Sequence, residues 1–415
     1  MTSSCFRSAL AGTAFTLLAL PLAAQDSTPS GPWTSPEQTI SLEAFLSNDQ
    51  LADQLQKIAD RSKGVVQLEI AGASGMGNPI MLVKIGDPAN MPVLIFTQQH
   101  GDEPHGTEAA MSVIRKLATG SAEAQRILDE VYVLVMPRVN PDGSAIPTRG
   151  NADFSAPASN TRQCPAAGGS SATGRGIFTT RFRDTDDFSY DVNRYHWGDW
   201  TDSWQYLCNP DGMGGSIYPV NPVPEAQAVL DTYFTYLPVW ALDIHNQGFN
   251  VVDDETCDSV AYCRDGQYVT GSILWPTNED VAEEVRDYSK QLALVMKKRS
   301  MEIGNVELTR YNGGSFAGIA RNAYGLRGTE RLTSGETGPL GGSILFEVAG
   351  QIEGSVFINN GQKAIGKLRS GVTKIMMSML EATADGSVLE EDPAEAEVII
   401  LDNDTFLVNP LAEEE

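Results

Sequence analysis

Four short apolar segments, separated by stretches with helical periodicity, constrain the fold of this chain most strongly. They cover residues 93–97, 131–136, 239–244 and 343–348. Each is almost continuously apolar, which is typical of strands that helices cover on both faces. Helical spacing of apolar side chains is found around them, at residues 107–118, 225–236 and 281–303. This alternation predicts an α/β fold with a mixed, mostly parallel central sheet and helices on both faces.

The segments outside this pattern extend the prediction. We expect residues 65–70 and 80–85 to form two further strands, paired as a hairpin. Helical periodicity also marks two outer segments, residues 41–62 and 373–382. A surface insertion is expected at residues 152–187, which are rich in glycine, serine, alanine and aspartate.

Charge is unevenly distributed over the 415 residues. The formal net charge of −25 argues against a nucleic-acid partner, because a phosphate backbone requires a basic surface. Residues 381–415 contain 12 aspartates and glutamates and no lysine or arginine. We expect residues 382–415 to form an acidic C-terminal tail beyond the domain. This tail is either a solvated face or two short strands, at residues 398–401 and 405–408.

The first 24 residues have the features of a cleaved signal peptide. Arg7 precedes an apolar run at residues 9–22, and the small residues Ala23 and Ala24 follow it. Residues 25–40 are then expected to form a flexible mature N-terminus. The signal peptide predicts a secreted or periplasmic protein. No other segment reaches 18 apolar residues, so no stable membrane insertion is expected.

Four cysteines remain after signal removal, an even number that is consistent with two disulfides in an exported protein. Proximity in sequence favours Cys164–Cys208 and Cys257–Cys263 among the three possible pairings. Four unpaired thiols are the alternative.

Two histidines follow predicted buried strands. His100 comes after residues 93–97, with Glu103 three residues later, and His245 comes after residues 239–244. Ligands bind at the carboxyl ends of strands in an open α/β sheet. Two histidines and one glutamate with an open fourth position are typical of catalytic zinc. Each histidine alone could be an ordinary loop residue. Because both are expected at the same carboxyl edge of the sheet, a metal site is favoured.

Further polar motifs occur at the same expected edge. Asn140-Pro141-Asp142-Gly143 follows residues 131–136, and Arg149-Gly150-Asn151 and Asp191-Val192-Asn193-Arg194 come later in the chain. Glu347 ends an apolar strand, where partial burial would raise its pKa toward the range of a general base.

In this order, the motifs resemble the zinc metallocarboxypeptidase family of the carboxypeptidase A type, over roughly residues 41–381. The resemblance implies that His100, Glu103 and His245 bind one Zn²⁺ per chain. It also implies that Glu347 is the general base, which activates the zinc-bound water and then protonates the leaving amine.

The resemblance implies roles for several substrate-facing residues. Arg149 would polarise the scissile carbonyl, although Arg183 in the insertion is a rival. Asn193 and Arg194 would grip the terminal carboxylate of the substrate. Tyr324 precedes Glu347 by about two dozen residues, the separation of the family's mobile tyrosine.

Three other residues are expected to support the site rather than bind metal or substrate. His105 and His196 are expected to pack behind it. Asp243 is a candidate for orienting His245 through the imidazole nitrogen that faces away from the metal.

The expected function is that of a secreted zinc metallocarboxypeptidase, which hydrolyses C-terminal residues of peptides through a zinc-activated water. Its partner would be a peptide with a free C-terminal carboxylate. Alternatives are a zinc amidohydrolase acting on N-acyl amino acids or cell-wall peptides, and a non-catalytic binding protein on the same scaffold. The complete ligand set and Glu347 favour an enzyme, and the signal peptide favours an extracellular peptide. The sequence does not predict the oligomeric state.

Overall fold

The computed structural model describes most of the chain between residues 45 and 408. The described residues are 45–154, 156, 179–181, 187–203, 206, 218–248, 251–252, 262, 269–303, 306–338, 341–352, 356–357, 361–402 and 407–408. The predicted signal peptide, the predicted mature N-terminus, all five cysteines, Arg183 and most of the predicted insertion lie outside them. The predicted disulfides and these domain boundaries therefore stay predictions.

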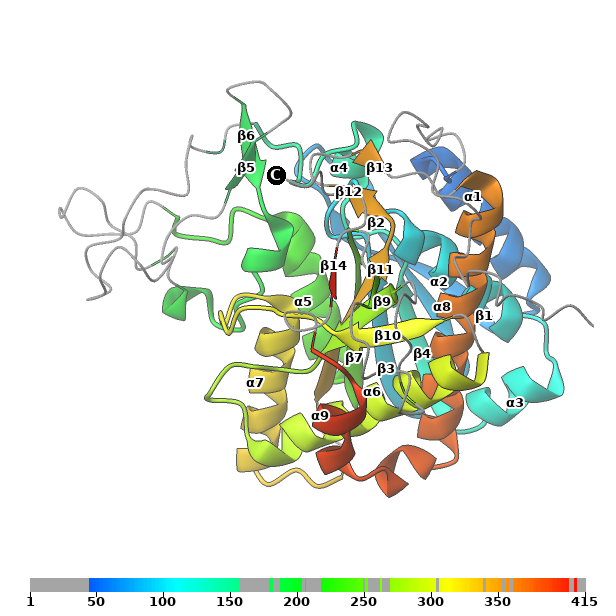
Figure 1. Cartoon of the computed structure of the whole chain (residues 1–415). Helices are drawn as coiled ribbons and strands as arrows, with labels where there is room; N and C mark the ends of the chain where they lie inside the picture. Colours follow the sequence, from blue (N-terminus) through cyan, green and yellow to red (C-terminus); the bar gives the residue numbers. More distant parts are fainter. Residues whose placement is uncertain are drawn as a thin grey trace, which may run out of the picture.

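An eight-stranded mixed sheet forms the centre of the molecule (Figure 1). Its strands are, in spatial order, β1 (Val66–Ala73), β2 (Pro79–Ile85), β4 (Val131–Met136), β3 (Met91–Thr97), β7 (Trp240–Gln247), β11 (Gly342–Ala349), β9 (Val269–Leu274) and β10 (Glu307–Arg310). The four central strands, β4, β3, β7 and β11, are parallel to one another, so their carboxyl ends lie at one edge. β1 and β2 form the predicted antiparallel hairpin.

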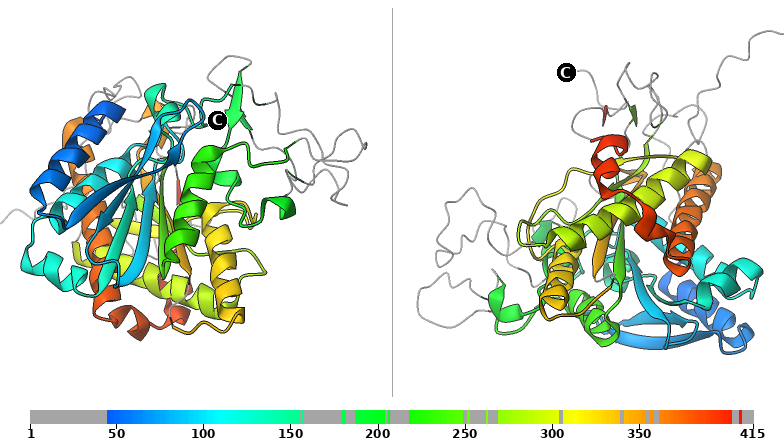
Figure 2. Two further views of the ribbon diagram at one scale, coloured as in Figure 1. Left: turned by 180° about the vertical axis from the view of Figure 1, so that it is seen from behind. Right: turned by 90° about the horizontal axis from the view of Figure 1, so that it is seen from below.

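Helices cover both faces of the sheet, as predicted (Figure 2). One apolar core joins the sheet to α1 (Asn48–Arg61), α2 (His105–Leu117), α3 (Ala122–Leu128), α6 (Glu283–Ile303) and α8 (Gly361–Ala384). A second core, on the opposite face, joins it to α5 (Pro224–Tyr236) and α7 (Ala320–Thr333). None of the helices in the described part of the chain is long and apolar enough to cross a membrane.

Several segments begin or end elsewhere than predicted. α1 begins at Asn48 because the Ser47 side chain accepts a hydrogen bond from the backbone N–H of Gln50 and forms a capping box. α8 is much longer than the predicted helix at residues 373–382. β5 (Thr179–Arg181), within the predicted insertion, pairs with β6 (Phe188–Tyr190), which directly follows that insertion.

The described part of the acidic tail packs on the domain through apolar side chains, whereas Glu390, Asp392, Glu395 and Glu397 stay exposed and form the predicted solvated face. α9 (Ala396–Ile399) lies against α6, with Ala396 and Ile400 buried (Figure 1). The predicted strand at residues 398–401 is therefore wrong, whereas β14 (Leu407–Val408) does form and pairs with β8 (Val251–Val252).

Charge complementarity explains this packing. Lys290 of α6 lies 2.8 Å from Glu397, and Lys298 pairs with Glu391 and, at 3.1 Å, with Glu395. Two lysines of α6 thus pair with three glutamates of the acidic segment.

Candidate active site

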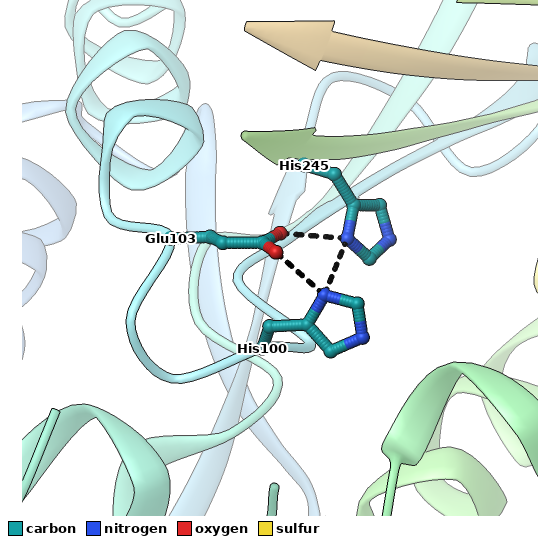
Figure 3. Close-up of side chains that lie close together, drawn as sticks. All are labelled: His100, Glu103 and His245. Carbon is teal, nitrogen blue, oxygen red and sulfur yellow. Dashed lines mark hydrogen bonds and ion pairs between the residues drawn. The ribbon is translucent and has the colours of Figure 1, made fainter. Parts of the chain in front are cut away.

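His100, Glu103 and His245 converge on one point at the carboxyl edge of the central strands (Figure 3). The Glu103 carboxylate lies 2.7 Å from Nδ1 of His100 and 2.7 Å from Nδ1 of His245. The two Nδ1 atoms are 3.0 Å apart. All three side chains are buried. This is the one such group of histidine, cysteine and acidic side chains among the described residues.

A second carboxylate contacts the far nitrogen of each histidine. Nε2 of His100 lies 3.0 Å from Asp191, and Nε2 of His245 lies 3.0 Å from Asp243. A carboxylate in this position fixes the tautomer in which Nε2 carries the proton and Nδ1 keeps its lone pair. The residues present therefore fit a zinc ion, because two lone pairs and one carboxylate point at a common centre.

Close backbone contacts between loops build this centre. A Cβ atom on Gly101, between the first two ligands, would lie 2.0 Å from the backbone of Gly143. A Cβ on Gly143 would in turn lie 2.4 Å from the carbonyl oxygen of Gly150. Only glycine allows these three backbone segments to touch in this way. The motif at residues 140–143 therefore shapes the metal loop.

Gln98 holds the strand end just before that loop. Its backbone has a left-handed φ of 56°, which is strained for a residue other than glycine. Its side-chain oxygen accepts hydrogen bonds from Arg138 Nε at 2.7 Å and Thr107 Oγ1 at 2.6 Å, and its amide nitrogen donates to the Gly101 carbonyl at 2.8 Å. These bonds hold the strained turn that presents His100.

Glu347 lies beside the metal residues. It stands opposite His245 in the register of the parallel strands β11 and β7, and its side chain is 8% exposed. Burial raises the pKa of its carboxyl to about 7, although His245 opposes the shift. A carboxyl with this pKa can both accept and return a proton near neutral pH.

Arg149 bridges the metal centre to Asp191. Its Nε and Nη2 each lie 3.2 Å from Asp191 Oδ2, and its Nη1 lies 3.4 Å from Glu103 Oε1. Burial would raise the pKa of Asp191, but the charges of Arg149 and then Arg194 lower it well below its usual range. The Arg149 side chain is still 38% exposed, so it also faces the open side of the centre.

Asn193 and Arg194 lie next to this group, on a single 3₁₀ turn (Val192–Arg194). Asn193 is buried: its Nδ2 lies 3.0 Å from His245 Nε2, and its Oδ1 accepts a hydrogen bond from the Ala320 N–H at 2.9 Å. Arg194 is partly exposed, and its Nη1 donates to the Asn193 carbonyl at 2.8 Å.

Comparison with known proteins agrees with this geometry. Residues 51–326 match the zinc carboxypeptidase family of M14 peptidases, which is well over half of the chain. The chain belongs to the zinc carboxypeptidase family. The match ends before Glu347, and the structure adds this residue to the centre.

Individual relatives of this family are distant. Carboxypeptidase SOL1 from Arabidopsis thaliana is 30% identical over 128 residues, which cover 28% of this chain and 26% of that protein. The fold resembles carboxypeptidase A from Helicoverpa armigera, with a TM-score of 0.54, 16% identity and coverage of 86% of this chain and 77% of that one. It also resembles thrombin activatable fibrinolysis inhibitor, with a TM-score of 0.54, 13% identity and coverage of 87% and 79%.

The structure corrects the expectation for Tyr324 in this family member. Tyr324 is fully buried in α7, where it stacks on Tyr233 and contacts the edge of Phe96. Its hydroxyl lies 2.9 Å from Nδ1 of His196. A side chain that is 0% exposed and enclosed by the core is not placed to contact a substrate.

Tyr311 is the tyrosine that lies near Glu347. The negative charge of Glu347 is the largest cause of the raised pKa of Tyr311, followed by burial and the charge of Glu103. In the sequence, Tyr311 directly follows Arg310, the last residue of β10, and no motif marks it. Counting back from Glu347 pointed instead to Tyr324.

The other two histidines do not join the metal group, as predicted. His105 begins α2 and packs against Phe45, with its Nδ1 bonded to Asn246. His196 is fully buried between Gln99 and Tyr324. Burial lowers the pKa of each imidazole to about 4.

Proposed function

We propose that this chain is a secreted or periplasmic zinc carboxypeptidase that releases single residues from the C-termini of peptides. The observation that carries the proposal is the position of Glu347 beside the buried group of His100, Glu103 and His245. A binding protein on this scaffold would not need a buried carboxyl with a pKa of about 7 at that position.

Each polar residue has a distinct task in the proposed reaction. Zinc, when bound, polarises the scissile carbonyl and lowers the pKa of a water molecule. Glu347 accepts a proton from the attacking water and delivers it to the departing amine. Arg149 stabilises the negative charge that develops on the carbonyl oxygen, because its guanidinium is fixed by Asp191 before the substrate arrives.

Arg194 is proposed to bind the C-terminal carboxylate. Its planar guanidinium can donate two parallel hydrogen bonds to a carboxylate, which a lysine cannot do. It lies on the same turn as Asn193, which contacts His245, so a bound carboxylate would lie close to the metal group.

The proposed location rests on residues 1–24, whose apolar run and flanking small residues have the pattern of a signal peptide. An exported enzyme meets peptides rather than cytosolic N-acyl amino acids, which favours the peptidase over the amidohydrolase alternative.

Paired peptides that differ only in a free or amidated C-terminus test this proposal. The zinc-loaded enzyme should release the last residue of the free peptide and leave the amidated one intact. R194A should raise KM for the free peptide about 10–100-fold, the value of a lost charge-assisted pair. The exposed control R126A should leave KM unchanged. Equal cleavage of both peptides by the wild type would refute the proposal.

A further inference from the structure

A buried chain of hydrogen bonds extends from the metal group to α7. Asp243 Oδ1, which contacts His245, also accepts a hydrogen bond from Nε2 of Gln99 at 2.8 Å. Oε1 of Gln99 lies 2.5 Å from Nε2 of His196, and Nδ1 of His196 lies 2.9 Å from the Tyr324 hydroxyl. All five side chains are at most 1% exposed.

We propose that Tyr324, His196 and Gln99 are positioning residues, which act through Asp243 to hold His245 in the orientation and tautomer that bind the metal. None of the three contacts the metal group's converging Nδ1 and carboxylate atoms. Gln99 also lies close to His245 itself, with its Nε2 3.3 Å from His245 Nε2, whereas His196 and Tyr324 would act only through the hydrogen bonds of the chain.

The chemistry of the groups allows only one direction for these bonds. A carboxylate only accepts, so Gln99 must turn its amide nitrogen to Asp243 and its oxygen to His196. His196 must then donate from Nε2. Burial lowers the pKa of His196 to about 4, so the ring is neutral and its Nδ1 accepts from the Tyr324 hydroxyl. Every donor therefore points toward Asp243.

This direction fixes the tautomer of His245. Asp243 can accept the Nε2 proton of His245 but can donate nothing in return. With the proton held on Nε2, the Nδ1 lone pair is available to a metal ion held together with Glu103 and His100. A change at the far end of the chain would leave Nδ1 of His196 without its donor and would weaken the support that Gln99 gives to Asp243.

Packing around Tyr324 makes the far end rigid. Its ring stacks on Tyr233 with centroids 4.6 Å apart and meets the edge of Phe96 at 5.7 Å. α7 is also tied to the site directly, because the Ala320 N–H donates to Asn193 at 2.9 Å. Helix α7, on one face of the sheet, thus supports a metal ligand on β7.

Removal of one hydroxyl tests the inference with little disturbance of packing. Y324F deletes the first donor of the chain. Y233F is the matched control, because it deletes a hydroxyl from the stacked neighbouring ring, which is outside the chain. Zinc affinity of the metal-free protein is measured by competition with a chelator. Y324F should weaken zinc binding about tenfold, which is the lower end of the effect expected when a hydrogen-bond partner behind a metal-bound histidine is lost. Y233F should weaken it less than twofold.

A second readout follows the protons directly. The chain has four histidines, so ¹⁵N-histidine NMR of the metal-free protein gives few signals. Wild type and Y233F should show His196 with its proton on Nε2 and with the Nδ1 signal of a hydrogen-bonded acceptor, and Y324F should shift that Nδ1 signal. Equal zinc affinity and equal spectra for Y324F and Y233F would overturn the inference, even if both variants lost stability. Failure of the wild type to bind zinc would overturn the metal assignment and this inference with it.

Discussion

Glu347 and His245 are directly opposite each other on the neighbouring parallel strands β11 and β7. Residues in register on adjacent strands point to the same side of a sheet. The proposed general base and a metal ligand are therefore placed together by the sheet itself, not by flexible loops. The remaining ligands, His100 and Glu103, come from the loop after β3, the strand on the other side of β7.

Arg149 should contribute to kcat rather than to substrate affinity. Because it faces the developing oxyanion in the proposed reaction, R149A should lower kcat about 100–1000-fold with little change in KM. Steady-state kinetics with a free-carboxylate peptide measure this, and zinc content by metal analysis should stay at one per chain. The control R115A, an exposed arginine of α2, should have wild-type kcat. A purely KM effect in R149A would contradict the assignment.

Gly143 should be required for the shape of the metal loop. In G143A the new methyl group would lie 2.4 Å from the Gly150 carbonyl, so the loops must separate. We expect a loss of about 1–3 kcal/mol in the free energy of unfolding and weaker zinc binding. Nothing lies within 4 Å of a Cβ on Gly366 in α8, so G366A should be neutral or stabilising by up to about 1 kcal/mol. Denaturant titrations compare the two variants.

Glu225 should make stability depend on pH. Its carboxyl accepts hydrogen bonds from the Gly75 N–H and Asn151, and burial raises its pKa from 4.5 to about 7. The folded state thus binds more protons than the unfolded state between these values, and stability falls as pH rises through this window. The free energy of unfolding of the wild type, measured relative to that of E225Q, should fall by about 3 kcal/mol as the pH rises from 4.5 to 7. A flat difference across this range would contradict the prediction.

Ile400 should show that the acidic tail is part of the fold. The side chain of Ile400 is 1% exposed in the core formed with α6, whereas Val398 two residues earlier is 59% exposed. I400A should lower the free energy of unfolding by about 2–4 kcal/mol, and V398A by less than about 0.5 kcal/mol. Similar small effects for both variants, measured by thermal or chemical unfolding, would mean that the tail does not contribute to the core.

The sequence predicted those parts of the fold whose physical cause is local. Strands buried on both faces must be apolar throughout, so β3, β4, β7 and β11 were visible as apolar runs. The metal residues were predictable because His100 and His245 come at the ends of two such runs.

The features that sequence did not predict depend on tertiary contacts. β9 contains Gly271, where a Cβ would lie 2.6 Å from the Glu347 carbonyl oxygen. The residues of β9 are therefore determined by close packing against β11 and not by strand propensity. α7 contains Gly325 and Gly328 for similar reasons, since Gly325 packs on Pro276. The packing of the acidic tail on the domain was not predictable, because the lysines that pair with its glutamates lie far away in sequence, on α6.

The activity of E347Q tests the central claim most directly. This substitution keeps the size of the side chain but removes the group that accepts and returns the proton. With zinc bound at one ion per chain, E347Q should lower kcat on a free-carboxylate peptide by about 100–10,000-fold, whereas E336Q, on the exposed surface, should not. Full hydrolysis by a zinc-loaded E347Q enzyme would contradict the account.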